Sequence, residues 1–358
     1  MPWGLLVRLR PAGPWRIGPV TGDRNRVDTI YHSDTLYSAV TWAMRDLGWL
    51  EEWLHDTAEA ATPAVRFSSC YPYQRRTMFV VPPRTLWPPP PSTRLRYRGA
   101  RFVAMQFVEA LLRDEPVDET RWLVDGASEC LMPSDRNEGP FRTTVRSAAA
   151  VDRVNPTAVH PHSAACIEFA PGCGLWFVCT FAGEEAGAKW LERVRGAVSL
   201  LAEGGFGGRR SSGWGVCEGA EFFEGELEAL LSPGAPGRST FQTPFTTVIT
   251  INKAEAPADA PPAPEKGESG WWLLSLFTPA DDEHIDWKRG NYGLVTRIGR
   301  AATGELKTPA TMVEEGSVLV SAEEPRGRAR NVAIGGADHP VYRAGFAVSV
   351  PVRLKAAS

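Results

Sequence analysis

The chain has 358 residues, a hydrophobic share of 43% and a formal net charge of -3. The length suits two domains with separate cores, and the hydrophobic share is ordinary for a globular protein. Because the total charge is slightly negative, any nucleic-acid binding must come from local basic patches. No stretch approaches the ~20 apolar residues of a membrane span, so we expect a cytoplasmic protein without membrane contact.

The first elements predict a strand, a turn and a helix. "WGLLVRLRPAGPWRIG" is typical of a strand and turn, and "DRNRVDTIYHSDTLYSAVTWAMRDLGWL" of a loop running into a helix. Ser33 or Asp34 can cap this helix, and Gly48 suits its exit. The residues at helical spacing are Leu36, Val40, Ala43, Met44 and Leu47.

The segment "FSSCYPYQRRTMFVVPPRTLWPPPPSTRLRYRGARFV" is rich in proline and arginine. We interpret it as an irregular, mobile surface excursion, and its proline run at 82–91 carries no motif that indicates a role.

A basic segment, "FRTTVRSAAAVDRVNPTAVHPHSAACIEF", then leads into a strand, and "LWFVCTFAG" returns from it. "GAKWLERVRGAVSLLAEGG" has the spacing of a helix, and "WGVCEGAEFF" reads as a closing strand. The order strand, helix, hairpin, helix, strand predicts a ferredoxin-like βαββαβ unit.

A second unit begins near "FQTPFTTVITINKA" and resumes with "WWLLSLFTPA", "YGLVTRIG", "GSVLVSAEE" and "VYRAGFAVSVPV". We interpret the low-complexity stretch at about 254–269 between them as a disordered insertion. The sequence therefore predicts an α+β fold of two ferredoxin-like (RRM-like) domains with loop insertions, residues 1–235 and 236–358.

The cysteines allow a zinc hypothesis, since Cys166, Cys173 and Cys179 lie near His160 and His162. No C-x-x-C pair occurs, and "ACIEFAPGCGLWFVCTF" alternates like a hairpin around its "PGCG" turn. We therefore expect reduced core or surface thiols and no metal or other cofactor.

The stretch "GGFGGRRSSGWG", residues 204–215, combines glycines with two arginines. It follows a helix C-terminus, which is the wrong end for a Walker or dinucleotide loop, and "RRSSG" lacks the first glycine of a nucleophile elbow. Arg209 and Arg210 can attract phosphates while the backbone amides and Trp214 approach a bound strand, which fits single-stranded RNA. The alternative is a glycine-rich hairpin with solvated arginines.

Together these motifs resemble a known family. "GGFGGRRSSGWGV" is similar to the glycine-rich loop of the RAMP superfamily of CRISPR RNA-binding proteins. "PWRIG" with "IYHSDTLYSAV", "TVRSAAAVDRVNPTA", "GNYGLVTRIGR", "EEGSVLV" and "HPVYRAGFAVSVPV" resemble, in this order, signatures of the fourth subunit of the type III-A Csm effector complex.

The resemblance implies a non-catalytic subunit that grips the 5′ handle of crRNA. It implies that this subunit joins the large polymerase/cyclase subunit to the backbone RAMP subunit of the filament and meets target RNA only indirectly. Carried over by motif, the RNA-facing residues are His32, Ser33, Asp34, Thr35, Arg146, Arg153, Gly205, Gly207, Gly208, Arg209, Arg210, Ser211, Ser212 and Trp214.

Three other functions stay open. A metal-independent RAMP endoribonuclease could use His32 as base with Arg209 or Lys189 as the cation, although we interpret His32 as a structural or RNA-contact residue. A target-cutting backbone subunit would need Asp152 or Asp28, which we expect to pair with neighbouring arginines. A protein-interaction module without RNA would leave the glycine loop unexplained.

Overall fold

The computed structural model describes residues 3–19, 22–151, 159–232, 247–250, 269–299, 306–335 and 339–354. The predicted insertion at 254–269 and the residues Asp152 and Arg153 therefore lie outside the described part, apart from Ser269, which opens a strand. No helix of the described part is long and apolar enough to cross a membrane.

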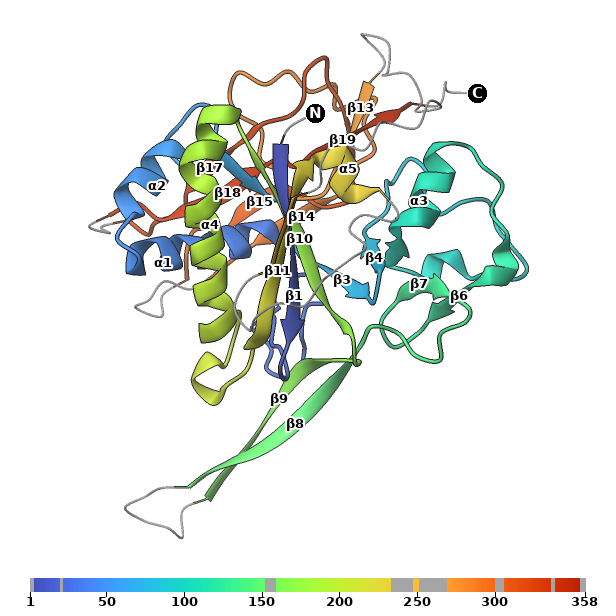
Figure 1. Ribbon diagram of the computed structural model, residues 1–358, viewed down its shortest axis with the longest axis horizontal. Helices are drawn as coiled ribbons and strands as arrows, with labels where there is room; N and C mark the ends of the chain where they lie inside the picture. Colours follow the sequence, from blue (N-terminus) through green and yellow to red (C-terminus); the bar gives the residue numbers. More distant parts are fainter. Residues whose placement is uncertain are drawn as a thin grey trace.

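The first half contains the predicted ferredoxin-like unit (Figure 1). Its strands lie in the order β11, β1, β10, β2, and every neighbouring pair is antiparallel, as in a βαββαβ sheet. The bounds are β1 Trp3–Pro11, α1 Ser33–Asp46, β2 Val65–Phe67, β10 Cys173–Phe181, α4 Glu184–Gly204 and β11 Cys217–Glu226.

The apolar faces of α1 and α4 were predicted correctly, with one exception at the end of α1. Val40 and Met44 of α1 and Trp190 and Val198 of α4 are fully buried, because each face follows the helical period. Leu47 is 37% exposed because α1 ends at Asp46 and Leu47 is its C-cap.

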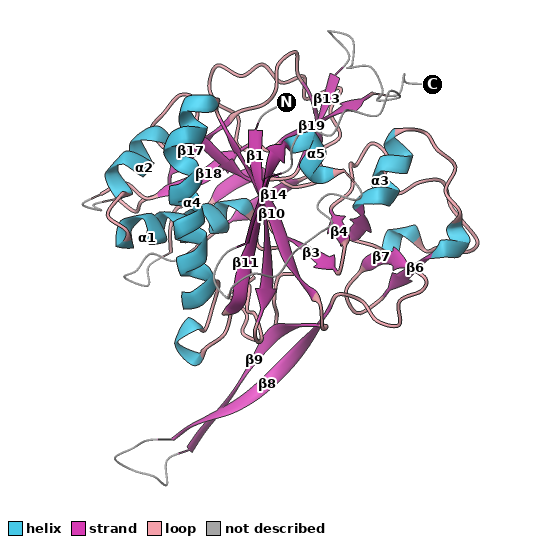
Figure 2. Ribbon diagram, viewed as in Figure 1, coloured by secondary structure: helices cyan, strands magenta, loops and turns pink. Residues whose placement is uncertain are grey.

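The proline-rich segment is irregular only in part: residues 81–96 form no helix or strand, but the expectation of an irregular excursion was wrong for the strands on either side of them. It extends the central sheet beyond β10 in the order β3, β4, β5, β7, β6 (Figure 2). The aromatic rings of Trp87, Tyr97, Phe107 and Trp122 hold it together, with centroids 5.2–6.1 Å apart in three of their pairs. Its elements are β3 Tyr71–Gln74, β4 Thr77–Val80, η1 Tyr97–Gly99, β5 Phe102–Ala104, α3 Met105–Leu112, η2 Glu119–Arg121, β6 Trp122–Asp125 and β7 Cys130–Pro133.

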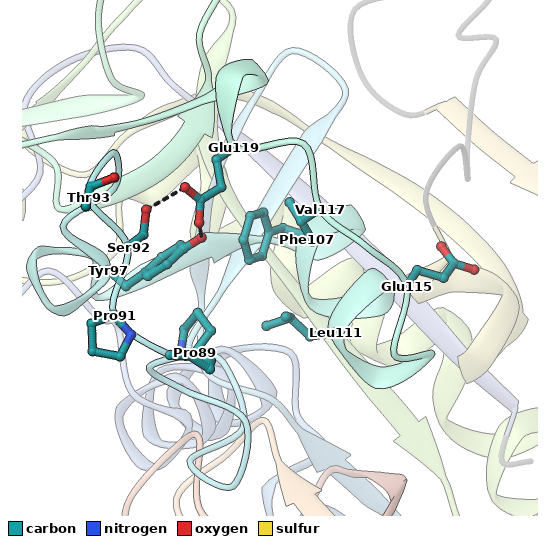
Figure 3. A pocket seen from close by; sticks show the side chains of 11 residues that line it. Pro89, Pro91, Ser92, Thr93, Tyr97, Phe107, Leu111, Glu115, Val117 and Glu119 are labelled. Atoms are coloured by element: carbon teal, nitrogen blue, oxygen red, sulfur yellow. Dashed lines mark hydrogen bonds between the residues drawn. The ribbon is translucent and has the colours of Figure 1, made fainter.

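A cavity of about 520 Å³ opens on this added subdomain, between the proline run and α3 (Figure 3). On its wall, the Tyr97 hydroxyl and the Ser92 hydroxyl each donate a hydrogen bond of 2.5 Å to the Glu119 carboxylate. The polar groups on this wall therefore satisfy one another within the protein.

A long two-stranded arm projects from the lower end of the sheet in Figure 1. β8 Phe141–Val151 pairs with β9 Val159–Phe169 in an unbroken antiparallel register from Phe141↔Phe169 to Val151↔Val159. The expected hairpin between the strands around "PGCG" was therefore wrong. The chain does turn there, but β9 pairs with β8 and β10 pairs with β1, β2 and β3.

The second half is formed by strands in its described part. The strands are β13 Ser269–Leu273, β14 Leu294–Arg297, β15 Ala310–Val313, β16 Val318–Val320, β17 Gly327–Asn331, β18 Tyr342–Phe346 and β19 Ser349–Arg353. They pair as β16-β13-β19, β14-β15 and β17-β18. The helices of a second ferredoxin-like unit are not found among the described residues 269–354, and the division at 235/236 stays a prediction.

The two halves share the largest hydrophobic core of the described part, and the second half adds a small cluster of its own. Tyr37 of α1 meets Phe346 of β18 edge-to-face at 5.4 Å, and Trp272 and Val352 belong to the same cluster as Leu5 of β1. β12 Thr247–Thr250, expected to open the second unit, instead pairs in parallel with β11 at the edge of the first sheet. The remaining helices are α2 Leu50–Asp56 and α5 Leu227–Leu231.

Candidate nucleic-acid interface

The glycine-rich loop begins where α4 ends, as predicted, and turns repeatedly through left-handed conformations. Gly205, Gly207, Gly213 and Gly215 have φ values of 88°, 76°, 75° and 80°. Arg209 has a φ of 62°, an unusual conformation for a residue with a side chain. Such a path requires glycine at most of its turns.

The glycines serve the protein's own packing, which the sequence did not reveal. A Cβ on Gly207 would lie 2.5 Å from the carbonyl oxygen of Arg16, and one on Gly215 would overlap the carbonyl of Phe206. The amide of Gly208 donates to the Arg16 carbonyl at 2.8 Å, and the amide of Gly215 to the Pro14 carbonyl at 2.9 Å. These amides are therefore used within the protein and are not available to a ligand.

Buried aromatic rings fix the loop from beneath. Phe206 stacks on Trp15 with centroids 5.4 Å apart and meets Tyr31 edge-on at 6.0 Å. Trp214 is 9% exposed and packs against Ala164 and Cys166 of β9, so the stacking face expected for a base is covered. The guanidinium of Arg209 lies 5.2 Å from the centre of the Trp214 ring.

The exposed part of the loop is cationic. Arg210, Ser211 and Ser212 form the short η3 turn and are exposed, and Arg209 is half-buried beside them. Among the described residues, no carboxylate lies within ion-pair distance of Arg209 or Arg210, so both side chains keep their charge for a ligand.

The arm brings a further predicted residue to the loop. Arg146 of β8 lies directly opposite Ala164 of β9, against which Trp214 packs. Its Nε and Nη2 atoms donate to Glu168 Oε1 at 2.9 and 2.7 Å, and Arg142 donates to the other oxygen of Glu168 at 3.1 Å. Because two arginines share one carboxylate, the face of the arm that carries Arg146 has excess positive charge.

Arg16 is a residue of this surface that sequence reasoning missed. Its guanidinium donates to the carbonyl oxygens of Ala165 at 2.7 Å, Arg24 at 2.9 Å and Asp23 at 3.0 Å, which joins the base of the arm to the first turn. Burial and the nearby charge of Arg209 lower the pKa of Arg16. The motif "PWRIG" was the available signal, although it does not show what Arg16 contacts.

The start of α1 holds the predicted residues 32–35, and its side chains turn into the protein. His32 is the N-cap, and the expected capping by Ser33 or Asp34 was wrong, because no side chain caps this helix. The Ser33 hydroxyl instead accepts from the amide of Leu276 in the second half at 3.0 Å. Thr35 is half-buried, and its hydroxyl accepts from Arg297 Nη2 of the second half at 3.1 Å. The set therefore faces the joint between the halves.

Both ring nitrogens of His32 are occupied. Nδ1 lies 2.7 Å from Glu315 Oε1 and Nε2 lies 3.0 Å from Asp28 Oδ2. Burial alone would lower the pKa of His32, but Glu315 and Asp28 raise it to about 9, so the ring is charged at neutral pH. A charged imidazole with both N–H groups in use has no nitrogen free to accept a proton, which argues against a catalytic base.

Asp34 lies in a second buried ion pair across the joint. Arg297 donates to its two oxygens at 3.1 Å each, and Arg343 also pairs with it. Burial opposes the charged form, but the two arginines hold the pKa of Asp34 down at about 2.

The other candidate residues have separate partners. Lys189 pairs with Asp56 at 2.7 Å near the start of α4, at the opposite end of that helix from the glycine loop. Asp28 binds His32, and its Oδ1 atom lies 3.6 Å from Arg101 Nη2. Its arginine partner is therefore Arg101, which is distant in the sequence, and not a neighbouring arginine as expected. All six cysteines are unpaired and buried.

The sheet order, the arm and the loop define an α+β protein of the RAMP fold. A chain in the crystal structure of a Csm3–Csm4 subcomplex in the type III-A CRISPR-Cas interference complex is similar over 98% of this chain and 99% of its own, with 14% identity and a TM-score of 0.59. A chain in a Csm1–Csm4 cassette in complex with cA4 is similar over 99% and 100%, with 18% identity and a TM-score of 0.53. A comparison with curated proteins finds no match.

The second half of the chain matches a family model. Residues 266–352 match the CRISPR Csm4 C-terminal domain. This match, together with the similarity of the fold to chains in Csm4-containing complexes, confirms the resemblance predicted from the sequence motifs.

Proposed function

We propose that the chain is the non-catalytic, RNA-binding Csm4 subunit of a type III-A CRISPR interference complex in the cytoplasm. In this proposal the glycine loop and the base of the arm hold the 5′ handle of crRNA. The large subunit and the backbone subunit bind other surfaces of the chain. The Csm4 C-terminal domain match and the Csm1–Csm4 and Csm3–Csm4 structures with the same fold support these partners.

The observation that carries the proposal is the unneutralised pair Arg209 and Arg210 on a rigid loop. Phe206 and Trp214 anchor the loop beneath, and Arg16 ties it to the arm that bears Arg146. Guanidinium groups match the geometry of phosphate oxygens, and a rigid platform loses little entropy when a strand binds. The buried ring of Trp214 means that phosphate contacts, and not base stacking on this indole, contribute most of the affinity.

The decisive experiment replaces Arg209 and Arg210 together by alanine in the full chain. We expect weaker binding of a repeat-derived RNA and a log–log salt slope shallower by roughly 0.7 for each phosphate that the variant no longer neutralises. The variant Arg326→Ala/Arg328→Ala is a charge-matched control, because these arginines pair with Asp282 and Asp281 in the second half. An unchanged slope in the folded loop variant would contradict the proposal.

The endoribonuclease alternative predicts a different result. A metal-independent enzyme would cut a repeat-containing RNA in EDTA, and His32→Ala would abolish cleavage. Because both nitrogens of His32 are bound to carboxylates, we expect no cleavage by either protein.

A further inference from the structure

A second group of cations lies across the first turn of α1 from the glycine loop. It comprises Arg297, Lys307, Arg330 and Arg343, all from the second half. Asp34 is the carboxylate that acts on three of them, because it pairs with Arg297 and Arg343 and also acts on Lys307. Glu315 and Asp28 also act on Arg297, so the excess positive charge of the group lies at Lys307, Arg330 and Arg343.

The geometry within this group is unfavourable without a further anion. Arg330 of β17 and Arg343 of β18 are directly opposite in the strand register, where like charges repel. Nine-tenths of the Arg343 side chain is buried, and its Nε atom has no hydrogen-bond partner among the described residues. An anion beside the Arg330 and Arg343 side chains would relieve the repulsion.

Lys307 reaches the same place from a different segment. Its amide donates to the carbonyl oxygen of Gly299 at 2.7 Å, and a Cβ on Gly299 would lie 3.3 Å from Arg343 Nη2 and 3.8 Å from Lys307 Cδ. The amide of Thr308 donates to the carbonyl of Val332 at 3.1 Å, which places Lys307 beside the end of β17 that carries Arg330. Burial and the charge of Arg343 lower the pKa of Lys307.

The group opens to solvent and is linked to the glycine loop through the segment that leads into α1. Arg330 is exposed and Lys307 is half-buried, and neither makes a hydrogen bond or ion pair through its side chain within the described part of the chain. Tyr31 packs against Phe206 of the loop, and Asp34, three residues further on, pairs with Arg343 of the group. The segment that leads into α1 therefore contacts both the loop and this group.

We propose that Lys307, Arg330 and Arg343 form a second phosphate-binding position for the same RNA strand that the glycine loop holds. This inference rests on the proposed function, and it gives the second half a direct part in RNA binding. The RNA would then bridge the two halves over the buried joint at His32 and Asp34.

The test compares Lys307→Gln/Arg330→Gln with Lys288→Gln/Arg289→Gln, a control with the same change of charge at exposed positions of the same half. Binding of the repeat-derived RNA by the full chain is measured between low and moderate salt. We expect the first variant to bind roughly tenfold or more weakly and to lower the salt slope by roughly 0.7 for each phosphate it no longer neutralises, while the control matches the wild type.

A stability measurement separates a ligand site from a structural role. Because Lys307 and Arg330 face like charges, we expect Lys307→Gln/Arg330→Gln to have a melting temperature equal to or above that of the wild type. A lowered melting temperature together with weaker RNA binding would assign these residues to folding and overturn the inference.

Three other outcomes would each overturn the inference. If Lys307→Gln/Arg330→Gln binds RNA like the wild type while Arg209→Ala/Arg210→Ala does not, the inference fails and the proposed function stands. If inorganic phosphate stabilises the wild type but not Lys307→Gln/Arg330→Gln, and RNA binding is unaffected, the site takes free phosphate and the RNA assignment is wrong. If the wild type binds no RNA, both proposals fall.

Discussion

Removing the charge of Asp34 tests whether its buried ion pair holds the two halves together. Asp34→Asn keeps the size of the side chain but leaves Arg297 and Arg343 without their carboxylate. Lowering the Asp34 pKa from 3.8 to about 2 corresponds to about 2–3 kcal/mol of stability, at about 1.4 kcal/mol per pKa unit. Removal of one partner from a buried pair costs about 3–5 kcal/mol in other proteins. We therefore expect a loss of about 2–5 kcal/mol.

The assay is urea unfolding at neutral pH, with Asp281→Asn as the matched control. Asp281 pairs with Arg328 but its side chain is 84% exposed, so its loss should cost at most about 1 kcal/mol. Acid adds a second readout. Because the folded pKa of Asp34 is depressed, its contribution is full above about pH 4 and disappears as the pH falls through about 2. Equal unfolding midpoints for the two variants, or an acid loss through about pH 2–4 as large in Asp34→Asn as in the wild type, would refute the reasoning.

Three further predictions concern the joint, the loop and the partners. The pKa of His32 is raised from 6.5 to about 9, so its contribution to stability should be full below pH 6.5 and fall as the pH rises through 9; His32→Gln should abolish this dependence in urea titrations. Gly215→Ala should destabilise the protein more than Gly213→Ala, although both have φ near 75–80°, because only at Gly215 would a Cβ overlap the chain; equal melting temperatures would contradict this. The isolated chain should bind the crRNA handle modestly and co-elute with the large and backbone subunits in size-exclusion chromatography; elution alone with full affinity would contradict the assignment.

Local pattern was sufficient for the two long helices of the first half, whereas β2 was not predicted and β9 was given the wrong partner. The spacing of Val40 and Met44 or of Trp190 and Val198 is a property of neighbouring residues, so α1 and α4 could be predicted with their buried faces. The position of the glycine loop after α4 follows from the same reasoning. The added strands β3–β7 could not be predicted, because prolines and arginines interrupt the local pattern and the aromatic contacts that hold this subdomain appear only in three dimensions.

The candidate site was predicted less completely because its contacts are long-range. His32 meets Glu315 across 283 positions of sequence, and Asp34 meets Arg343 across 309. Nothing adjacent to "HSDT" shows that these side chains turn toward the second half. The glycines of the loop were correctly singled out for backbone freedom, but their close approach is to Pro14 and Arg16.

The common core has a practical consequence for dissecting this protein. Residues 266–352 match a family domain, yet Trp272, Phe346 and Val352 belong to a cluster completed by residues of the first half such as Tyr37 and Leu5. A fragment cut at the family boundary would expose these apolar side chains to water and would leave Glu315 and Arg297 without their charged partners. We therefore expect residues 266–352 alone to be less stable than in the full chain, although Leu273, Phe277 and Leu319 form a small cluster within them, and fragments should be designed to retain α1.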